Sequence, residues 1–179
     1  FLFAALVLLN KWSSGFFGLY NTVGKVFLVF SNHQALEQML SLWQRWRRGE
    51  SLPRGLRKWN QIFAHLRDIR SWGVQDRILE TGVLDDWKER VEHNEEVLPC
   101  EIELWFHRDP NVRATARNRV VDLVTAQQGR VLNEAIMEDI AYHALLVELP
   151  VASVLRVIEG AGDDIGLVQC EQIQFFRAT

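Results

Sequence analysis

The stretch CEIELWFHRDPNVRATARNRVVDLV, from Cys100 to Val124, decides the fold of this chain. In its first seven residues, Ile102, Leu104 and Phe106 alternate with the other side chains, and this alternation predicts a half-buried strand. Asp109 followed by Pro110 is typical of a helix start, and apolar residues then recur at helical spacing. The stretch therefore predicts a strand followed directly by a helix.

The residues that follow this helix complete a regular order. Two strands, a second helix and a last strand are predicted at residues 130–133, 141–149, 150–160 and 165–173. The order β-α-β-β-α-β is that of a ferredoxin-like antiparallel sheet with two helices on one face. We therefore expect an α+β fold. In this arrangement the first and last strands are neighbours, which brings Cys100 and Cys170 close in register, and two buried free thiols are favoured over a disulfide.

The first half of the chain shows a similar pattern with fewer elements. Strands are predicted at residues 2–9 and 25–30, and Ser31–Gln34 has the spacing of a capping box. A helix with one apolar stripe follows and ends at Gly49. A second amphipathic helix is predicted over residues 59–69.

Charge is unevenly distributed along the chain. Basic residues are concentrated between Arg45 and Arg70, and acidic residues between Glu80 and Glu96. Either the acidic segment lies against the basic helices or both are solvated faces. We expect three parts: an N-terminal α/β unit, an acidic connector and a ferredoxin-like domain, at residues 1–75, 76–98 and 99–179.

Composition limits the classes of function. With 179 residues and a net charge of −3, the whole chain does not have the charge of a general polyanion binder. Two cysteines do not form a disulfide framework, which favours a cytoplasmic location over secretion. The apolar segment Phe1–Leu9 is shorter than the roughly 20 residues that a membrane-spanning helix needs, so we expect no membrane partner.

Motifs that carry catalytic chemistry are missing from the sequence. There is no glycine-rich phosphate loop, no His-Glu-x-x-His, no Cys-x-x-Cys and no Gly-x-Ser-x-Gly, and the five histidines are scattered. We therefore predict no catalytic residue, no metal and no cofactor. The predicted third strand, around Tyr142, lacks the aromatic pattern of an RNA-binding sheet, and the acidic segment beside the basic helices argues against a clean basic face. We expect no nucleic-acid partner, and a stand-alone ferredoxin-like interaction or nucleic-acid-binding module is the alternative.

Four stretches carry a resemblance to a known family. They are IELWFHRDPNVRATARNRVVDLV, GRVL with ALLVELPVASVLRVIEG, LVQCEQIQFFR, and DIRSWGVQDRI upstream. Together they resemble the N-terminal, propeptide-like (inhibitor-like) region of bacterial subtilisin-type serine peptidases of the subtilase family. The chain lacks that family's catalytic blocks, Asp-(Ser/Thr)-Gly, His-Gly-Thr and Gly-Thr-Ser-Met. The resemblance thus implies a non-catalytic region that acts as intramolecular chaperone and autoinhibitor of a subtilisin-like catalytic domain, in cis or in trans.

The resemblance also implies where the partner binds. The tail would lie in the substrate cleft of the protease, and it consists of Gln174, Phe175, Phe176, Arg177, Ala178 and Thr179. One of the two phenylalanines can instead belong to the domain's own core, because strand neighbours alternate. The turn residues Glu138 and Asp139 are either contacts to helix N-termini on the protease or solvated. Propeptides of this family are shorter than this chain, so residues 1–97 are additional, and cleavage after Thr179 stays open.

Overall fold

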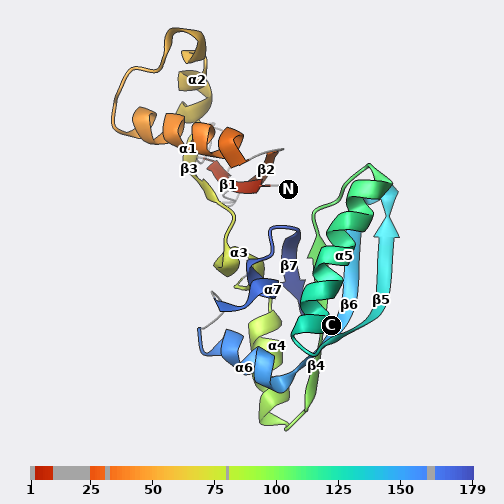
Figure 1. Ribbon diagram of the computed structural model, residues 1–179. Coiled ribbons are helices and arrows are strands. Elements are labelled where there is room, and N and C mark those ends of the chain that lie inside the picture. The colour runs from red at the N-terminus through yellow and green to blue at the C-terminus, as the bar shows by residue number, and fades with distance from the viewer. Residues whose placement is uncertain (1–2, 10–24, 31–32, 80, 161–163) are drawn as a thin grey trace, which may run out of the picture. The chain divides into compact units, whose positions relative to one another are not determined.

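The chain forms an α+β protein, here as a computed structural model that describes residues 3–9, 25–30, 33–79, 81–160 and 164–179 (Figure 1). It divides into two compact units, Phe1–Trp72 and Gly73–Thr179, which we call unit 1 and unit 2. The boundary lies close to the expected one after residue 75.

Unit 1 combines a three-stranded antiparallel sheet with helices. Its described elements are, in chain order, β1 (Phe3–Leu9), β2 (Lys25–Phe30), α1 (His33–Arg47), the 3₁₀ turn η1 (Arg54–Leu56), α2 (Trp59–Ala64) and β3 (Leu66–Ser71). The strand order is β2-β1-β3. The capping box expected at residues 31–34 begins outside the described residues. The apolar stripe of α1 packs as expected, with Leu36, Met39 and Trp43 in the core of unit 1.

The second predicted helix of unit 1 is wrong in its second half. Helix α2 ends at Ala64, and the next residues form β3, which pairs with β1. Leu66 and Ile69 are both buried in the core of unit 1. Two apolar residues three positions apart suit a helix. Here, pairing with a distant strand determines the backbone conformation instead.

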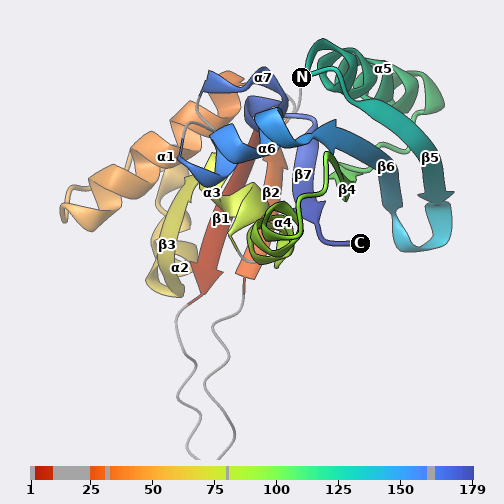
Figure 2. The same ribbon diagram turned by 90° about the horizontal axis from the view of Figure 1, so that it is seen from below.

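Unit 2 contains the β-α-β-β-α-β order that the sequence predicts, with additional short helices. Its described elements are α3 (Val74–Ile78), α4 (Val83–Glu92), β4 (Val97–Leu104), α5 (Pro110–Ala126), β5 (Arg130–Met137), the 3₁₀ turn η2 (Glu138–Ile140), β6 (Tyr142–Pro150), α6 (Val151–Ile158), α7 (Gly166–Gln169) and β7 (Ile173–Arg177). The strands lie in the order β5-β6-β4-β7, and each neighbouring pair is antiparallel (Figure 2). The strands that come first and last along the chain in the β-α-β-β-α-β order, β4 and β7, are therefore neighbours in the sheet.

The last strand lies further along the chain than predicted. The sequence places it at residues 165–173, whereas Gly166–Gln169 is the short helix α7 and the strand runs from Ile173 to Arg177. Leu167 and Val168 are buried from this helical turn rather than from a strand. The tail residues Gln174–Arg177 thus belong to the sheet of unit 2.

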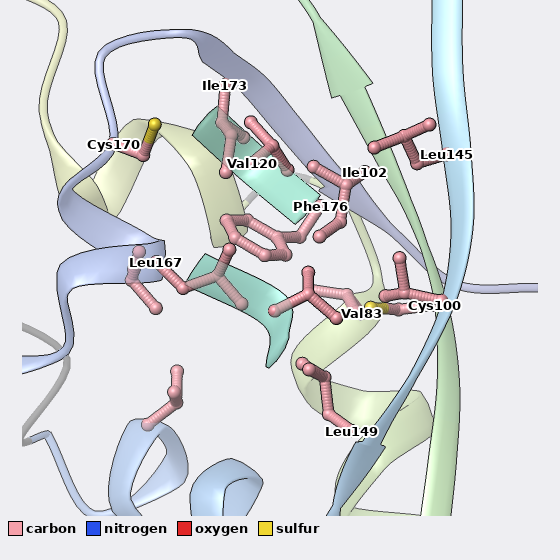
Figure 3. Packing of buried hydrophobic residues seen from close by; sticks show 14 of the residues in the cluster. Val83, Cys100, Ile102, Val120, Leu145, Leu149, Leu167, Cys170, Ile173 and Phe176 are labelled. Carbon is pink, nitrogen blue, oxygen red and sulfur yellow. The ribbon is translucent and has the colours of Figure 1, made fainter. Parts of the chain in front are cut away.

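One hydrophobic cluster joins the helices of unit 2 to one face of its sheet. Strand β4 contributes every second residue to this cluster, and helices α4, α5, α6 and α7 contribute the residues that pack against the strand residues. Figure 3 shows Phe176 within this cluster, near Ile102 and Val120. Cys100 and Cys170 are both buried and free, which confirms that the two thiols are not bridged.

The segment that we expected to be a connector is part of unit 2. Ile78 of α3 and Val83 and Trp87 of α4 lie in the hydrophobic cluster of the unit. The Arg77 side chain is buried and donates hydrogen bonds to the carbonyl oxygens of Ile173 (3.0 Å) and Val168 (3.2 Å). Residues 76–98 are therefore not a free connector. They pack within unit 2, and Arg77 among them bonds to the last strand.

Candidate functional site

The candidate site begins at β7, the edge strand that pairs with β4. In the register of the two strands, Phe176 lies opposite Ile102 and Phe175 lies opposite Glu103. The register shifts between Ile173 and Phe175. Such a β-bulge adds a residue to one strand, so that Ile173 and Phe176 both face the core although they are three residues apart. Phe176 is fully buried, with its ring edge-on to that of Trp87 at a centroid distance of 6.4 Å.

Phe175 and Arg177 lie on the opposite face of the sheet. We call this face the outer sheet face, and the outward-facing residues that line it near β7 are Glu101, Glu103, Tyr142, Leu146, Phe175 and Arg177. The Arg177 guanidinium lies 4.7 Å from the centroid of the Phe175 ring. Its Nη2 lies 2.6 Å from Oε2 of Glu103, whose side chain is only 14% exposed. The outer sheet face thus presents an aromatic ring beneath a paired charge.

A tyrosine extends this polar network across the sheet. Burial, followed by a hydrogen bond to Glu101 and the negative charges of Glu101 and Glu103, raises the pKa of Tyr142 to about 12. Nε of Arg177 lies 4.0 Å from Oε1 of Glu101, so both carboxylates have the same cation as neighbour. The Tyr142 hydroxyl is therefore a hydrogen-bond donor at neutral pH.

The chain leaves the sheet after Arg177, and its last two residues are exposed. Nη2 of Arg90 on α4 donates to the main-chain oxygen of Thr179 over 3.4 Å. Nε of the same arginine is bonded to Asp86 at 2.9 Å, which fixes the guanidinium on the helix. The exit of the chain is thus tied to α4 both here and through the contact between Trp87 and Phe176.

Glu138 and Asp139 lie where expected, in the turn η2 between β5 and β6. Glu138 accepts a hydrogen bond of 2.8 Å from Nη2 of Arg113, a side chain that is almost buried. Asp139 is exposed, as are the apolar side chains of Met137 (51%) and Ile140 (68%) on either side of the acidic pair. One carboxylate thus stabilises the fold, and the other is available to a partner.

A cluster of hydrogen-bonded polar side chains that the sequence does not predict lies between α5 and the sheet. Nε2 of the fully buried His143 lies 2.9 Å from Oε1 of Glu134, and Arg117 donates to the other oxygen at 3.1 Å. Burial by itself would raise the pKa of Glu134, but the hydrogen bonds from His143 and Arg117 outweigh it and lower this pKa. The i, i+4 spacing of Arg113 and Arg117 on α5 is the only sequence signal for this cluster.

Neither a metal site nor a membrane span occurs in the part of the chain that the structure describes. No group of three or more His, Cys, Asp or Glu residues there is placed to hold a metal ion. Within the same residues, no helix combines the length and apolar character needed to cross a bilayer.

Comparison with known proteins adds no further assignment. No family model matches the chain, and neither a curated protein sequence nor a solved structure matches it.

Proposed function

We propose that unit 2 is the propeptide-like, inhibitory and folding-assisting domain of a subtilisin-like serine protease. In this proposal the outer sheet face docks on the catalytic domain, and the chain beyond Arg177 enters the substrate cleft. One observation carries the proposal. The last strand anchors Phe176 in the core, turns Phe175 and Arg177 to the outer face, and leaves Ala178 and Thr179 exposed.

The geometry of β7 suits a segment that binds in extended form. An extended peptide that adds to a protease cleft gains main-chain hydrogen bonds, and alternate side chains fill pockets. A segment that continues a fixed strand has already lost much of its conformational freedom, which reduces the entropic cost of binding. Because Phe175–Arg177 pair with β4, cleft contacts in this proposal begin at Ala178.

The outer sheet face has the composition of a docking surface. Aromatic residues and arginine are enriched in protein interfaces, and Phe175, Tyr142 and Arg177 lie together on this face. At the β5–β6 turn, the exposed carboxylate of Asp139 suits the positive end of a helix dipole on the partner. The apolar side chains of Met137 and Ile140 beside it add surface that a partner would bury.

The proposal extends to the compartment of the protein. Burial raises the pKa of the Cys170 thiol, and burial raises that of Cys100 as well, so both remain unreactive thiols. Free buried thiols suit a reducing, cytoplasmic location. The inhibited protease would then act inside the cell, with its catalytic domain joined to this chain or supplied separately.

A titration tests the proposal. The full chain is added to a subtilisin-type catalytic domain encoded in the same or a neighbouring reading frame, and peptide hydrolysis is followed. We expect inhibition in the nanomolar range, equivalent to about 12 kcal/mol of binding free energy. A variant that ends at Arg177 should bind more weakly but remain folded, because it keeps all of β7.

Matched variants locate the contact. Phe175→Ala should weaken inhibition, whereas Val112→Ala, which removes an exposed apolar side chain from α5, should leave it unchanged. Inhibition that survives Phe175→Ala but is lost on truncation places the binding energy in the tail alone. Absence of inhibition by the full chain refutes the protease proposal and leaves a stand-alone interaction module.

A further inference from the structure

The two units carry opposite charge. Unit 1 contains ten Lys and Arg residues against three Asp and Glu, a formal charge of +7. Unit 2 contains ten against twenty, a formal charge of −10. The net charge of −3 for the whole chain is therefore the sum of a strongly basic unit and a strongly acidic one.

The acidic segment that argued against a basic binding face belongs to unit 2. Its helix α4 packs into the core of that unit through Val83 and Trp87. Two of its carboxylates, Asp86 and Glu95, are bonded to a cation of the same unit, Arg90. The acidic segment is therefore part of the fold of unit 2, and unit 1 taken by itself keeps its excess of cations.

Unit 1 concentrates its cations along the chain from the end of α1 to the start of β3. We call this group the arginine surface; its members are Arg45, Arg47, Arg48, Arg54, Arg57, Lys58 and Arg67. All except the half-buried Arg45 are exposed. Only two carboxylates pair with it among the described residues: Glu50, bonded to Arg45 and Arg48, and Asp68, at 3.8 Å from Arg47.

The arginine surface adjoins a cluster of tryptophans. The rings of Trp46 on α1 and Trp59 on α2 lie 6.0 and 5.6 Å from that of buried Phe63, and both indoles are half-buried. Trp46 also stacks on Trp43, with centroids 5.2 Å apart. Trp46 and Trp59 thus have cations as direct sequence neighbours, and the Arg47 guanidinium lies 6.0 Å from the centroid of the Trp43 ring.

We propose that the arginine surface of unit 1 binds the sugar-phosphate backbone of single-stranded nucleic acid. Arginine forms bidentate contacts with phosphate, and six of the seven cations are arginines. Single strands bind to positive surfaces that also offer aromatic rings for base stacking, as Trp46 and Trp59 do. This function is independent of the one proposed for unit 2.

An anionic membrane is the main competing partner, and the surface suits it less well. Proteins that bind at a lipid surface insert exposed apolar side chains below the headgroups. Within residues 33–72 of unit 1, Ile62 is the one exposed large aliphatic side chain, at 46%.

Fluorescence anisotropy with the full chain tests the proposal. The probe is a labelled single-stranded oligonucleotide of about 20 nucleotides, longer than one typical single-strand site. The variant Arg54→Gln/Arg57→Gln/Lys58→Gln removes three exposed cations without a described carboxylate partner. We expect about tenfold weaker binding or more at low salt, and a plot of log affinity against log salt whose slope falls by about 2.

The control carries the same change in charge on unit 2. Arg108→Gln/Arg119→Gln/Arg156→Gln also removes three exposed cations and should leave binding unchanged. Equal losses in the two variants, or no binding by the wild-type chain at low salt, would overturn the proposal. Binding to phosphatidylserine vesicles without binding to the oligonucleotide would overturn it as well and assign the surface to a membrane. The single variants Arg54→Gln and Lys58→Gln should give smaller losses in the same direction, which guards against misfolding of the triple variant.

Discussion

Two adjacent phenylalanines differ sharply in their contribution to stability. Phe176 is fully buried against Trp87, whereas Phe175 lies half-buried under Arg177 on the outer sheet face. Phe176→Ala should lower the free energy of unfolding by about 3–5 kcal/mol, because it leaves a cavity in a packed core. Phe175→Ala is the matched control and should cost about 1 kcal/mol or less. Urea denaturation measures both, and equal losses would contradict the assigned orientation of the strand.

The raised pKa of Tyr142 predicts that the chain loses stability in alkaline solution. Its pKa is raised to about 12 in the folded chain, from 10.0 for the unperturbed side chain. Below pH 10 both folded and unfolded chains keep the phenolic proton, and the contribution of Tyr142 is fully present. Between pH 10 and pH 12 only the unfolded chain loses this proton, so the free energy of unfolding falls as pH rises.

The absorbance of tyrosinate checks this prediction directly. The chain has two tyrosines, so Tyr142→Phe leaves a single phenol to titrate. We expect the wild type to show a titration phase near pH 12 that is absent from the variant. The variant should also lose less stability than the wild type between pH 10 and pH 12. A wild-type titration complete by pH 11 would show that Tyr142 is not held by Glu101.

Among the elements, α5 owes its start to one side chain. Oδ1 of Asp109 accepts a hydrogen bond from the backbone N–H of Asn111 at 2.8 Å, and Pro110 follows as the first helical residue. Asp109→Ala should lower the free energy of unfolding by about 1 kcal/mol. Asp122→Ala, at an exposed position within the same helix, is the control and should have little effect. Thermal unfolding of the two variants separates the loss of the cap from a general change in charge.

How well each element could be predicted depends on whether its signals are local. Helix α5 carries its cap, its first-turn proline and its apolar spacing within its own sequence, and its prediction is confirmed. The sequence predicts a helix where β3 lies and places β7 too early, because their partners, β1 and β4, are distant in the chain and β7 contains a bulge. The bulge also decided which phenylalanine is buried, and no local pattern specifies it.

The candidate site was predictable in position but not in detail. The sequence placed the acidic pair Glu138–Asp139 in the correct turn. It could not show that Arg113, 25 residues earlier, already binds Glu138, or that Glu103 binds Arg177 across the sheet. Such pairs depend on strand register and helix packing, which are properties of the whole unit.

At the scale of the whole molecule, unit 2 needs more residues than its β-α-β-β-α-β order. A fragment of residues 73–179 should fold with a sharp thermal transition, because it contains the complete hydrophobic cluster. A fragment of residues 97–179 lacks Trp87 and the Arg77 side chain that bonds to Ile173. Loss of a large buried ring and of a buried hydrogen-bonding cation removes several kcal/mol, roughly the whole stability of a small domain.

Circular dichroism of the two fragments tests this expectation. The longer fragment should keep the near-ultraviolet signal of packed aromatic rings, and the shorter one should lose it. The variant Trp87→Ala in the longer fragment is the intermediate case, with a lowered melting temperature. A shorter fragment as stable as the longer one would mean that α3 and α4 merely lie against a self-sufficient domain.

The fixed exit of the chain has a consequence for regulation. Thr179 is three residues beyond the fully buried Phe176, and an extended chain advances by about 3.5 Å per residue, so a protease cleft that holds Thr179 would lie within about 10 Å of the core of unit 2. If the proposed catalytic domain is joined to this chain by a short flexible tether, its effective concentration is in the millimolar range. At that concentration, even a micromolar intrinsic affinity keeps all but about one molecule in a thousand bound. In a joined arrangement, therefore, breaking the tether would release activity more effectively than weakening the contact.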